Sequence, residues 1–265
     1  MVNLININCI LQRTMAKHYK VHASTAQSIG DRQEQQDRLL FIPHERYPDH
    51  LMAVVADGMG GRTGGGIAAE QVITTMRQLF NRYKLNESIT DLLAECVTES
   101  HATIKMLSIS EEKEPHSTVV ALICTPDTFH WVHIGDSRLY VFRHGVLKEC
   151  TQDHSFVMDA ITAGKMTIEQ ASVHPNRSVL TSALGMVTEL RFSLGVLEQP
   201  QVGDSFLLAS DGLWAYFRHD ELCQIISSMT AKAATKLLME IARERGDKKG
   251  DNISIVVVKL TPQNR

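Results

Sequence analysis

The stretch Leu51–Gly66 reads LMAVVADGMGGRTGGG: an apolar run passes directly into an aspartate and then into six glycines within nine positions. Its first six residues are apolar and include β-branched side chains, which predicts a short buried strand. Glycines this dense suit backbone that bends sharply or approaches a ligand closely. A carboxylate at the end of a buried strand is costly unless a positive charge neutralises it, and no lysine or arginine precedes Asp57 nearby. We therefore expect a cation at Asp57; the alternative is a tight turn with a solvated aspartate.

Glycine-rich segments also cradle phosphates, and two motifs of that kind can be compared with this stretch. A P-loop requires Gly, four residues and then Gly-Lys-Ser/Thr, but no lysine follows these glycines. The segment Gly64–Ala69 fits a dinucleotide-binding pattern, yet it begins seven residues after Asp57 instead of directly off the strand. It leads into two helical segments and not into a second strand that ends in an acid. The sequence therefore does not predict nucleotide binding here.

The whole chain of 265 residues has a formal net charge of −3 and a sequence pI ≈ 6.5. This balance gives no reason to expect nucleic acid or an anionic membrane as a partner, and the apolar runs are too short to cross a membrane. The five cysteines are far apart without a CxxC pair, which argues against a zinc ribbon or a disulfide framework and fits the cytoplasm. We expect residues 1–18 to form an N-terminal arm, loosely held over residues 1–14, and residues 19–262 a single domain.

Periodicity and turn signals predict the remaining elements. Apolar residues recur at helical spacing in four segments, 64–83, 89–108, 221–227 and 231–245. Residues 153–175 are expected to be helical with an interruption at Gly164. Strands are expected at 19–28, 38–42, 118–124, 129–134, 138–142, 146–149, 190–196, 206–209 and 252–260. Many antiparallel strands and two helix pairs predict an α+β fold: two packed antiparallel β-sheets, a β-sandwich, flanked by α-helices in four α-β-β-α layers.

Three more aspartates repeat the pattern of an acid at the end of a strand. Asp136 and Asp211 each follow a predicted strand, and Asp251 precedes the last one. Each has a glycine beside it, and four such positions are hard to explain as chance turns. Carboxylate oxygens without His or Cys at ligand spacing favour the hard cations Mg²⁺ and Mn²⁺. Clustered carboxylates repel each other, so we expect the site to be loosened when no metal is bound.

A series of short motifs follows one another between residues 20 and 260. The motifs are Arg32 with Gln36-Asp37, Asp57-Gly58-Met59-Gly60-Gly61, Gly135-Asp136-Ser137-Arg138-Leu139-Tyr140, Thr151 with Asp153-His154-Ser155, Ala183-Leu184-Gly185, Ser210-Asp211-Gly212-Leu213-Trp214 and Gly250-Asp251-Asn252. In this order they resemble the metal-dependent protein phosphatases of type 2C, bacterial branch. The resemblance implies a β-sandwich flanked by helices, two metals at one end of it, and hydrolysis of phosphoserine and phosphothreonine.

The resemblance also implies which residues hold two metal ions tightly. Asp57, a catalytic residue, bridges both ions, and the carbonyl group of Gly58 binds one of them. Asp211 and Asp251 complete the other. The expected cofactor is Mn²⁺ or Mg²⁺. Hydrolysis then proceeds by attack of a metal-bridging water or hydroxide on phosphorus.

Further roles surround this pair of ions, again by resemblance. Arg32 binds the substrate phosphate and is the second catalytic residue, while Asp37 holds metal-bound water. Asp136, together with Asp211, holds a third and weaker metal. Residues 156–178 correspond to the family's mobile flap beside the site.

Two positions depart from the animal members of the family. Met59 stands where those enzymes have a histidine proposed as general acid, so the leaving group takes its proton from water or elsewhere. Gln36 stands where they have a glutamate, which weakens the ligand set of one metal. Both changes are usual in the bacterial branch. We interpret both tryptophans, Trp131 and Trp214, as packing residues.

Two other functions compatible with the same fold are a catalytically inactive phosphoprotein-binding module and a phosphatase of small phosphate esters. Retention of every aspartate argues against the first, and the second requires a narrow pocket. For the protein phosphatase we expect phosphorylated protein substrates, a cognate Ser/Thr kinase with the same targets, and a monomer in the cytoplasm. We expect neither nucleic acid nor a membrane as a partner.

Overall fold

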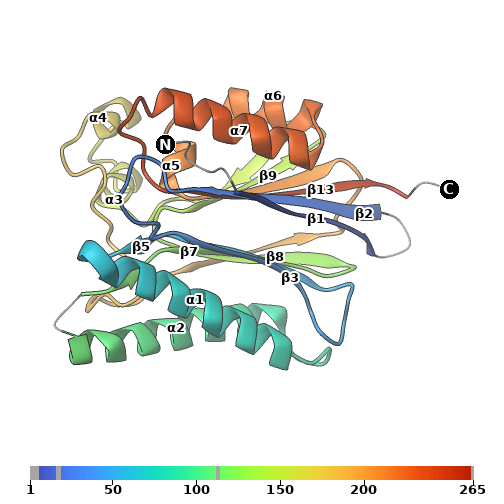
Figure 1. Ribbon diagram of the computed structural model, residues 1–265, viewed down its shortest axis with the longest axis horizontal. Helices are drawn as coiled ribbons and strands as arrows, with labels where there is room; N and C mark the ends of the chain where they lie inside the picture. The colour runs from blue at the N-terminus through green and yellow to red at the C-terminus, as the bar shows by residue number, and fades with distance from the viewer. Residues whose placement is uncertain (1–5, 16–18, 112–113, 264–265) are drawn as a thin grey trace.

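Two antiparallel sheets form the centre of the computed structural model, which describes residues 6–15, 19–111 and 114–263 (Figure 1). The larger sheet has the strand order β1-β2-β13-β12-β9-β10, with bounds Asn6–Met15, Tyr19–Ser28, Ile253–Pro262, Asp204–Ala209, Arg138–Arg143 and Val146–Cys150. The smaller sheet has the order β11-β8-β7-β4-β3, with bounds Ser193–Glu198, Thr128–Ile134, Val119–Cys124, Leu51–Ala56 and Arg38–Pro43. A short separate pair consists of β5 (Gly58–Met59) and β6 (His116–Ser117).

Two helix pairs enclose the sheets. The smaller sheet is covered by α1 (Gly61–Arg82) and α2 (Ile89–Glu111), and the larger one by α6 (His219–Ser228) and α7 (Ala231–Arg245) (Figure 1). At one end of the sandwich lie α3 (Phe156–Thr162), α4 (Ile168–Ser172) and α5 (Asp211–Trp214). The predicted four-layer α-β-β-α sandwich is therefore confirmed.

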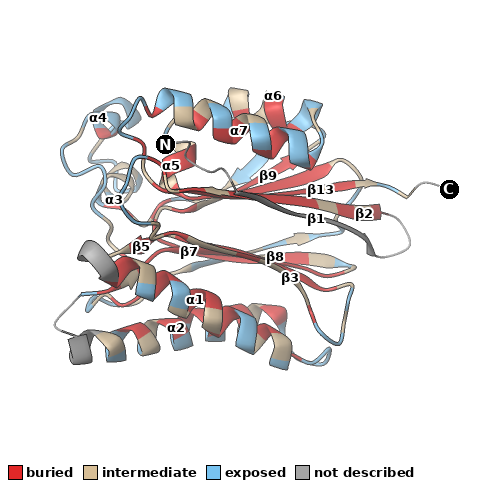
Figure 2. Ribbon diagram, viewed as in Figure 1, coloured by how far each residue is buried: buried red, intermediate tan, exposed pale blue. Residues whose placement is uncertain are grey.

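The strand β4 shows how the layers use a continuous apolar run. Met52 and Val54 belong to the hydrophobic cluster beneath α1 and α2, whereas Leu51 and Val55 belong to the cluster between the two sheets. Successive strand residues point to opposite faces, so a strand covered on both faces is apolar at every position. A third cluster fills the space between the larger sheet and α6 and α7. Figure 2 shows the buried residues along the sheets and on the inward faces of the helices.

The N-terminal segment differs from the expectation of a loosely held arm. Residues Asn6–Met15 form β1, which pairs antiparallel with β2 from Asn6 opposite Gln27 to Met15 opposite Tyr19. The prediction is therefore wrong for these residues, while residues 1–5 and 16–18 lie outside the described part. Polar residues interrupt the apolar pattern of this segment, and its pairing depends on the unpaired edge that β2 offers.

Other differences are local. Residues 153–175 contain two short helices, α3 and α4, separated by residues 163–167, in place of one interrupted helix. The strand expected from residue 190 begins at Ser193. The two-residue strands β5 and β6 and the single turn of α5 were not predicted. Elements this short have no measurable periodicity.

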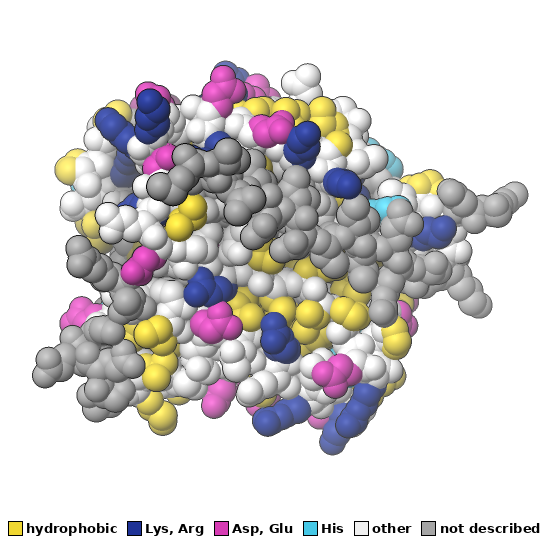
Figure 3. Space-filling model, in the orientation of Figure 1, with side chains coloured by type: hydrophobic (Ala, Val, Ile, Leu, Met, Phe, Trp, Pro, Cys, Tyr) yellow, Lys and Arg dark blue, Asp and Glu magenta, His cyan; other side chains and the backbone are white. Residues whose placement is uncertain are grey.

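The outer surface mixes charges of both signs. Acidic and basic side chains are interspersed over the face shown in Figure 3, which agrees with the small net charge of −3. Among the described helices, none combines the length and the apolar character needed to cross a bilayer.

Candidate metal centre

The acids predicted from strand ends meet at one end of the sandwich. Asp57 joins β4 to β5, Asp211 begins α5, and Asp251 lies just before β13. A cavity of ≈ 610 Å³ opens between them. The predicted site residues that line it are Arg32, Asp57, Gly58, Asp136, Asp211 and Asp251. Met59 and Gln36, the two departures from the animal enzymes, line the same cavity, as do Ser178, the last residue of the predicted flap, and Leu180 just beyond it.

The glycines after Asp57 allow two segments of backbone to touch. A Cβ atom at Gly58 would lie 2.0 Å from the carbonyl oxygen of Gly65 and 2.7 Å from that of Gln36. A Cβ atom at Gly65 would in turn lie 2.4 Å from the carbonyl oxygen of Gly58. The first turns of α1 therefore pack directly against the segment that follows Asp57. This close approach, and not a phosphate cradle, explains why both positions are glycine.

Backbone hydrogen bonds fix Asp57 between β4 and β5. Its N–H donates to Thr118 Oγ1 at 3.1 Å, and its carbonyl oxygen accepts from the Thr118 N–H at 2.8 Å. The hydroxyl group of Ser117 donates to the same carbonyl oxygen at 3.1 Å. The main chain of Asp57 is thus held on both sides. Its carboxylate therefore projects from a fixed position.

Asp37 lies behind the cavity and is almost completely buried, with 1% exposure. Its Oδ2 accepts a hydrogen bond of 2.7 Å from Ser210 Oγ, which in turn accepts one of 2.9 Å from the Ser254 N–H. Ser210 immediately precedes Asp211, so one residue links the Asp37 carboxylate to the strand end that carries Asp211. Sequence reasoning missed this role of Ser210, although its position beside Asp211 was a usable signal.

Burial and mutual repulsion raise the pKa of four carboxyl groups above the ordinary aspartate value. For each of them burial is the largest cause, and neighbouring carboxylates add to it. The pKa of Asp37 rises to about 7, that of Asp211 to about 6, and that of Asp136 to about 8. The pKa of Asp57 rises well above its usual range, with Asp37 as the strongest neighbouring charge. Ionising this cluster at neutral pH therefore requires added positive charge.

The donor set fits hard divalent cations. The residues that line the described cavity offer carboxylate and carbonyl oxygens and no imidazole or thiolate, which is the chemistry that Mg²⁺ and Mn²⁺ prefer. Among the described residues, no three His, Cys, Asp or Glu side chains lie close enough together to coordinate one metal ion as they stand.

Arg32 is turned toward the acids. Its Nη2 donates to Asp251 Oδ2 at 2.5 Å, and its side chain remains 60% exposed. The neighbouring Asp31 does not compete for Arg32, because it is held by Arg243 at 2.9 and 3.0 Å and by the Gly250 N–H at 2.9 Å. This contact keeps a guanidinium group at the rim of the cavity, where it can meet an anion.

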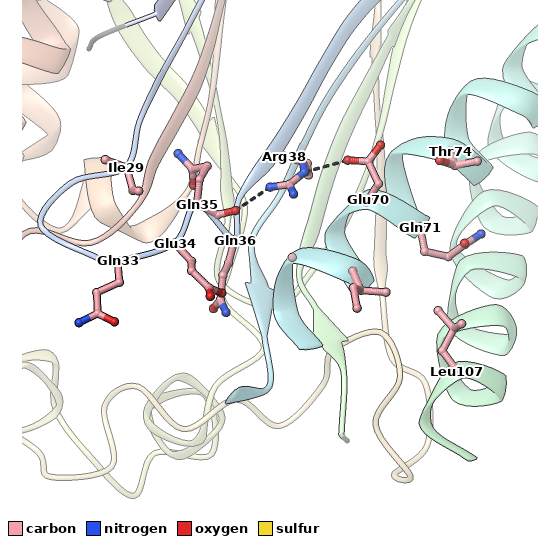
Figure 4. Close-up of a pocket in the computed structure, with 12 residues that line it drawn as sticks. Ile29, Gln33, Glu34, Gln35, Gln36, Arg38, Glu70, Gln71, Thr74 and Leu107 are labelled. Carbon is pink, nitrogen blue, oxygen red and sulfur yellow. Dashed lines mark hydrogen bonds and ion pairs between the residues drawn. The ribbon is translucent and has the colours of Figure 1, made fainter. Parts of the chain in front are cut away.

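A second hollow adjoins the cavity. It measures ≈ 640 Å³ and shares the residues Gln33, Glu34 and Gln36 with it. The opposite wall is α1, from Gly66 to Thr74, and Leu107 of α2 contributes at the far end (Figure 4). In the close-up, Glu70 points from α1 toward Arg38, while Gln71 lies on the side of α1 nearer Leu107. We call this hollow the α1 groove.

The α1 groove has a fixed ion pair at one wall. Arg38 Nε donates to Glu70 Oε2 at 2.8 Å, and Arg38 Nη1 donates to the Gln35 carbonyl oxygen at 2.7 Å (Figure 4). Arg38 thereby joins the Gln33–Gln36 loop to α1. The groove and the metal cavity therefore share one wall, the Gln33–Gln36 loop.

Comparisons with known proteins agree with this geometry. The family model "Protein phosphatase 2C" matches residues 26–246, and the chain belongs to that family. A 2C-type protein phosphatase of Streptococcus pyogenes is 32% identical over 211 residues, which cover 78% of this chain and 85% of that protein. The solved serine/threonine phosphatase of Streptococcus agalactiae superposes with a TM-score of 0.83 at 27% identity, covering 90% of this chain and 99% of that one.

The serine/threonine protein phosphatase PstP of Mycobacterium tuberculosis provides a third comparison. It is 30% identical over 220 residues, which cover 81% of this chain but only 41% of PstP. A PstP catalytic domain solved in complex with two manganese ions has the same fold, with a TM-score of 0.79 at 24% identity and coverage of 92% of this chain and 100% of that one.

Proposed function

We propose that this protein removes phosphate from phosphoserine and phosphothreonine side chains of other proteins, with Mn²⁺ or Mg²⁺ as cofactor. The observation that carries the proposal is the convergence of four aspartates on one cavity, Asp57, Asp136, Asp211 and Asp251, with Asp37 buried close behind them. Membership of the protein phosphatase 2C family supports it. The relatives are named serine/threonine phosphatases, which supports the choice of phosphoamino acid.

The residues divide the work as follows. Asp57, the Gly58 carbonyl group, Asp211 and Asp251 hold two ions, and Asp37 keeps a water molecule in place beside them. The bound ions supply a water molecule of lowered pKa and positive charge for the phosphoryl oxygens.

Arg32 receives the phosphate group of the substrate. Its guanidinium group offers two parallel donors to a phosphate, a geometry that a lysine ammonium cannot reproduce. Met59 has no proton to donate, so the leaving oxygen takes one from water. Asp136, opposite Asp211, holds a third and weaker ion.

The shape of the site favours a protein substrate over a small ester. The cavity is open to solvent and continues into the α1 groove through Gln33, Glu34 and Gln36. Polypeptide on one side of the phosphorylated residue can lie in that groove. A narrow pocket, which a phosphatase of small esters needs for selectivity, is not what these residues form.

The proposal includes the setting of the enzyme. We propose a monomer in the cytoplasm that acts on the targets of a cognate Ser/Thr kinase, with residues 19–262 as a single domain that β1 extends at the edge of the larger sheet. The free state of the four described cysteines supports a reducing compartment. The segment 156–178 serves as a flap: α3 has no buried residue and α4 buries only Ala171, so this segment has little packing to hold it.

The deciding experiment is a phosphatase assay on three substrates: a phosphothreonine peptide, a phosphotyrosine peptide and p-nitrophenyl phosphate. Each is tested with Mn²⁺ and with excess EDTA. We expect Mn²⁺-dependent release of phosphate with the phosphothreonine peptide preferred, and no turnover by Asp57→Asn. Activity that survives EDTA would refute the metal assignment. Turnover of the small ester alone would favour the small-ester enzyme, and peptide binding without turnover would favour the inactive module.

A further inference from the structure

The short helix α5 connects two of the acids. Asp211 is its first residue and Trp214 its last. The indole Nε1–H of Trp214 donates a hydrogen bond of 2.9 Å to the main-chain carbonyl oxygen of Asp136. Residues three apart in a helix are joined by backbone of fixed length. Trp214 therefore connects the turn that carries Asp136 to the helix that begins at Asp211.

The orientation of the Trp214 ring is itself fixed. The Arg138 guanidinium carbon lies 3.5 Å from the centre of the ring, a stacked cation–π contact. Arg138 in turn forms a two-pronged ion pair with Asp153, with both N–O distances at 2.7 Å. Both side chains of the pair are mostly buried, with exposures of 18% and 10%. A planar guanidinium group held in this way cannot rotate without breaking the pair, so the indole is held as well.

The segment that contains Asp153 also holds the other side of the Asp136 turn. The His154 N–H donates to the Gly135 carbonyl oxygen at 2.7 Å, and the Gly135 N–H donates to His154 Nδ1 at 3.2 Å. Gly135 has a φ of 95°, a conformation that favours glycine. The turn is thus held to residues 153–154 on one side and to α5 on the other.

Asp136 and Asp211 both line the metal cavity. The Trp214 hydrogen bond joins the main chain of Asp136 to the helix that begins at Asp211, so losing that bond frees the spacing between the two side chains.

We infer that Trp214 is a positioning residue: its indole N–H sets the separation of Asp136 from Asp211 and thereby the affinity of the weaker, third metal site. The inference rests on the proposed function, because the role of Asp136 as a metal ligand is part of that proposal. It changes the interpretation of Trp214, which sequence analysis assigned to packing alone.

The first experiment separates positioning from packing by calorimetric titration of Mn²⁺. Trp214→Phe keeps a ring over Arg138 and removes the N–H donor, and Trp214→Tyr serves if that variant folds poorly. We expect the tight sites to be unchanged and the weak site to lose roughly two- to tenfold in affinity, the effect of one lost hydrogen bond. The Mn²⁺ concentration for half-maximal turnover should rise by the same factor, with kcat at saturating Mn²⁺ retained.

A double-mutant cycle with Asp136→Ala makes the test specific. Asp136→Ala should remove the weak site, and adding Trp214→Phe to it should change metal binding no further. The positioning role is overturned if Trp214→Phe binds Mn²⁺ as tightly as the wild type does. It is also overturned if Trp214→Phe lowers the affinity for Mn²⁺ by the same factor in the wild type and in the Asp136→Ala variant. If Asp136→Ala leaves the weak site intact, Trp214 has no ligand to position and the inference also fails. The phosphatase assay judges the proposed function separately in each case.

Trp131→Phe is the matched control and also supplies a spectroscopic probe. Trp131 is buried in β8 against Gly195 and does not line the metal cavity. The chain has two tryptophans, so this variant leaves Trp214 as its single fluorophore. We expect normal metal affinities and a change in Trp214 emission as Mg²⁺ fills the weak site. Adding Asp136→Ala should abolish the change. If Trp214 emission does not change over the Mg²⁺ concentrations that fill the weak site, the inference is contradicted.

Discussion

Arg32 and Asp251 show how one contact serves two purposes. The hydrogen bond of 2.5 Å places a cation on a carboxylate that we assign to a metal ion. Arg32 and a metal ion therefore compete for the same oxygen, while Arg32 and the metal together attract a phosphate. The arginine is exposed, so little stability depends on it.

We predict that Arg32→Ala lowers kcat/KM for a phosphopeptide by roughly tenfold or more, because a charge-assisted hydrogen bond contributes about 1.5–3 kcal/mol. Metal affinity should hold or increase slightly, since Asp251 loses a competitor. Steady-state kinetics with inorganic phosphate as inhibitor, together with calorimetry, provide the measurement. Arg32→Lys should recover only part of the loss. If kcat/KM and inhibition by phosphate are both unchanged in Arg32→Ala, Arg32 does not bind the substrate phosphate and is only a surface residue.

The raised pKa values predict how stability depends on pH in the metal-free protein. The folded-state pKa of Asp37 is about 7 and that of Asp136 about 8, both above the unfolded value of 3.8. The folded state thus binds protons more tightly, so its stabilisation is complete below about pH 4 and is lost as pH rises through 7 and 8. In EDTA, the free energy of unfolding from urea denaturation should fall between pH 5 and pH 8.5.

Two comparisons check the cause of this fall. Asp37→Asn and Asp136→Asn each remove one titrating group, so each should flatten the slope. Saturating Mn²⁺ should oppose the fall, because the metal replaces the protons. If both variants keep the slope of the wild type, groups other than Asp37 and Asp136 produce the fall in stability.

At the level of elements, the contact between α1 and the segment after Asp57 depends on two glycines. Gly58 and Gly65 approach so closely that neither has room for a Cβ atom, whereas a Cβ atom at Gly66 would find its nearest neighbour at 3.6 Å. None of these three glycines has a positive φ. They therefore differ in the space available for a side chain and not in backbone strain. The position of Gly58 at the cavity therefore depends on how tightly α1 packs.

We predict that Gly65→Ala destabilises the protein by about 1–3 kcal/mol, the usual cost of overpacking, and weakens metal binding because the Gly58 segment must shift. Gly66→Ala, one residue further along the same helix, should be neutral or stabilising by up to ~1 kcal/mol, since alanine favours helix. Urea denaturation and calorimetric Mn²⁺ titration of the two variants test this. Equal effects of the two substitutions would contradict the close-contact explanation.

At the level of the whole molecule, two hollows lie side by side on one loop. The metal cavity holds the reacting group, and the α1 groove can hold neighbouring polypeptide through apolar and amide side chains such as Ile67 and Gln71. A small ester would fill only the first. Comparing a peptide with a small ester therefore separates the contribution of the α1 groove from that of the metal cavity.

We predict that Ile67→Ala lowers kcat/KM for a phosphothreonine peptide several-fold and leaves that for p-nitrophenyl phosphate unchanged. The reason is that Ile67, 37% exposed on α1, lines the groove but not the cavity. Val146→Ala is the matched control, because Val146 is an exposed apolar residue of β10 outside both hollows. Equal loss on both substrates would show that Ile67 affects the metal centre instead.

Much of the fold was predictable because its causes are local. The period of apolar residues marked the long helices and most strands, and glycine and aspartate at strand ends marked the site. Where the elements were short, as in β5, β6 and α5, no period existed to be detected. Where pairing required a distant edge, as in β1, the segment alone contained no signal for it.

The sequence by itself determined the four-layer sandwich and identified the aspartates at the strand ends. The reason is that apolar periodicity and residue chemistry can be read from neighbouring positions in the chain. Only the tertiary structure decided which side chains hold those acids in place. Asp37 accepts from Ser210, and Arg32 lies against Asp251, 219 residues away. The Trp214 indole reaches the Asp136 main chain across 78 residues. Contacts of this range depend on how the sheets stack and where turns end, and residue spacing along the chain does not encode them.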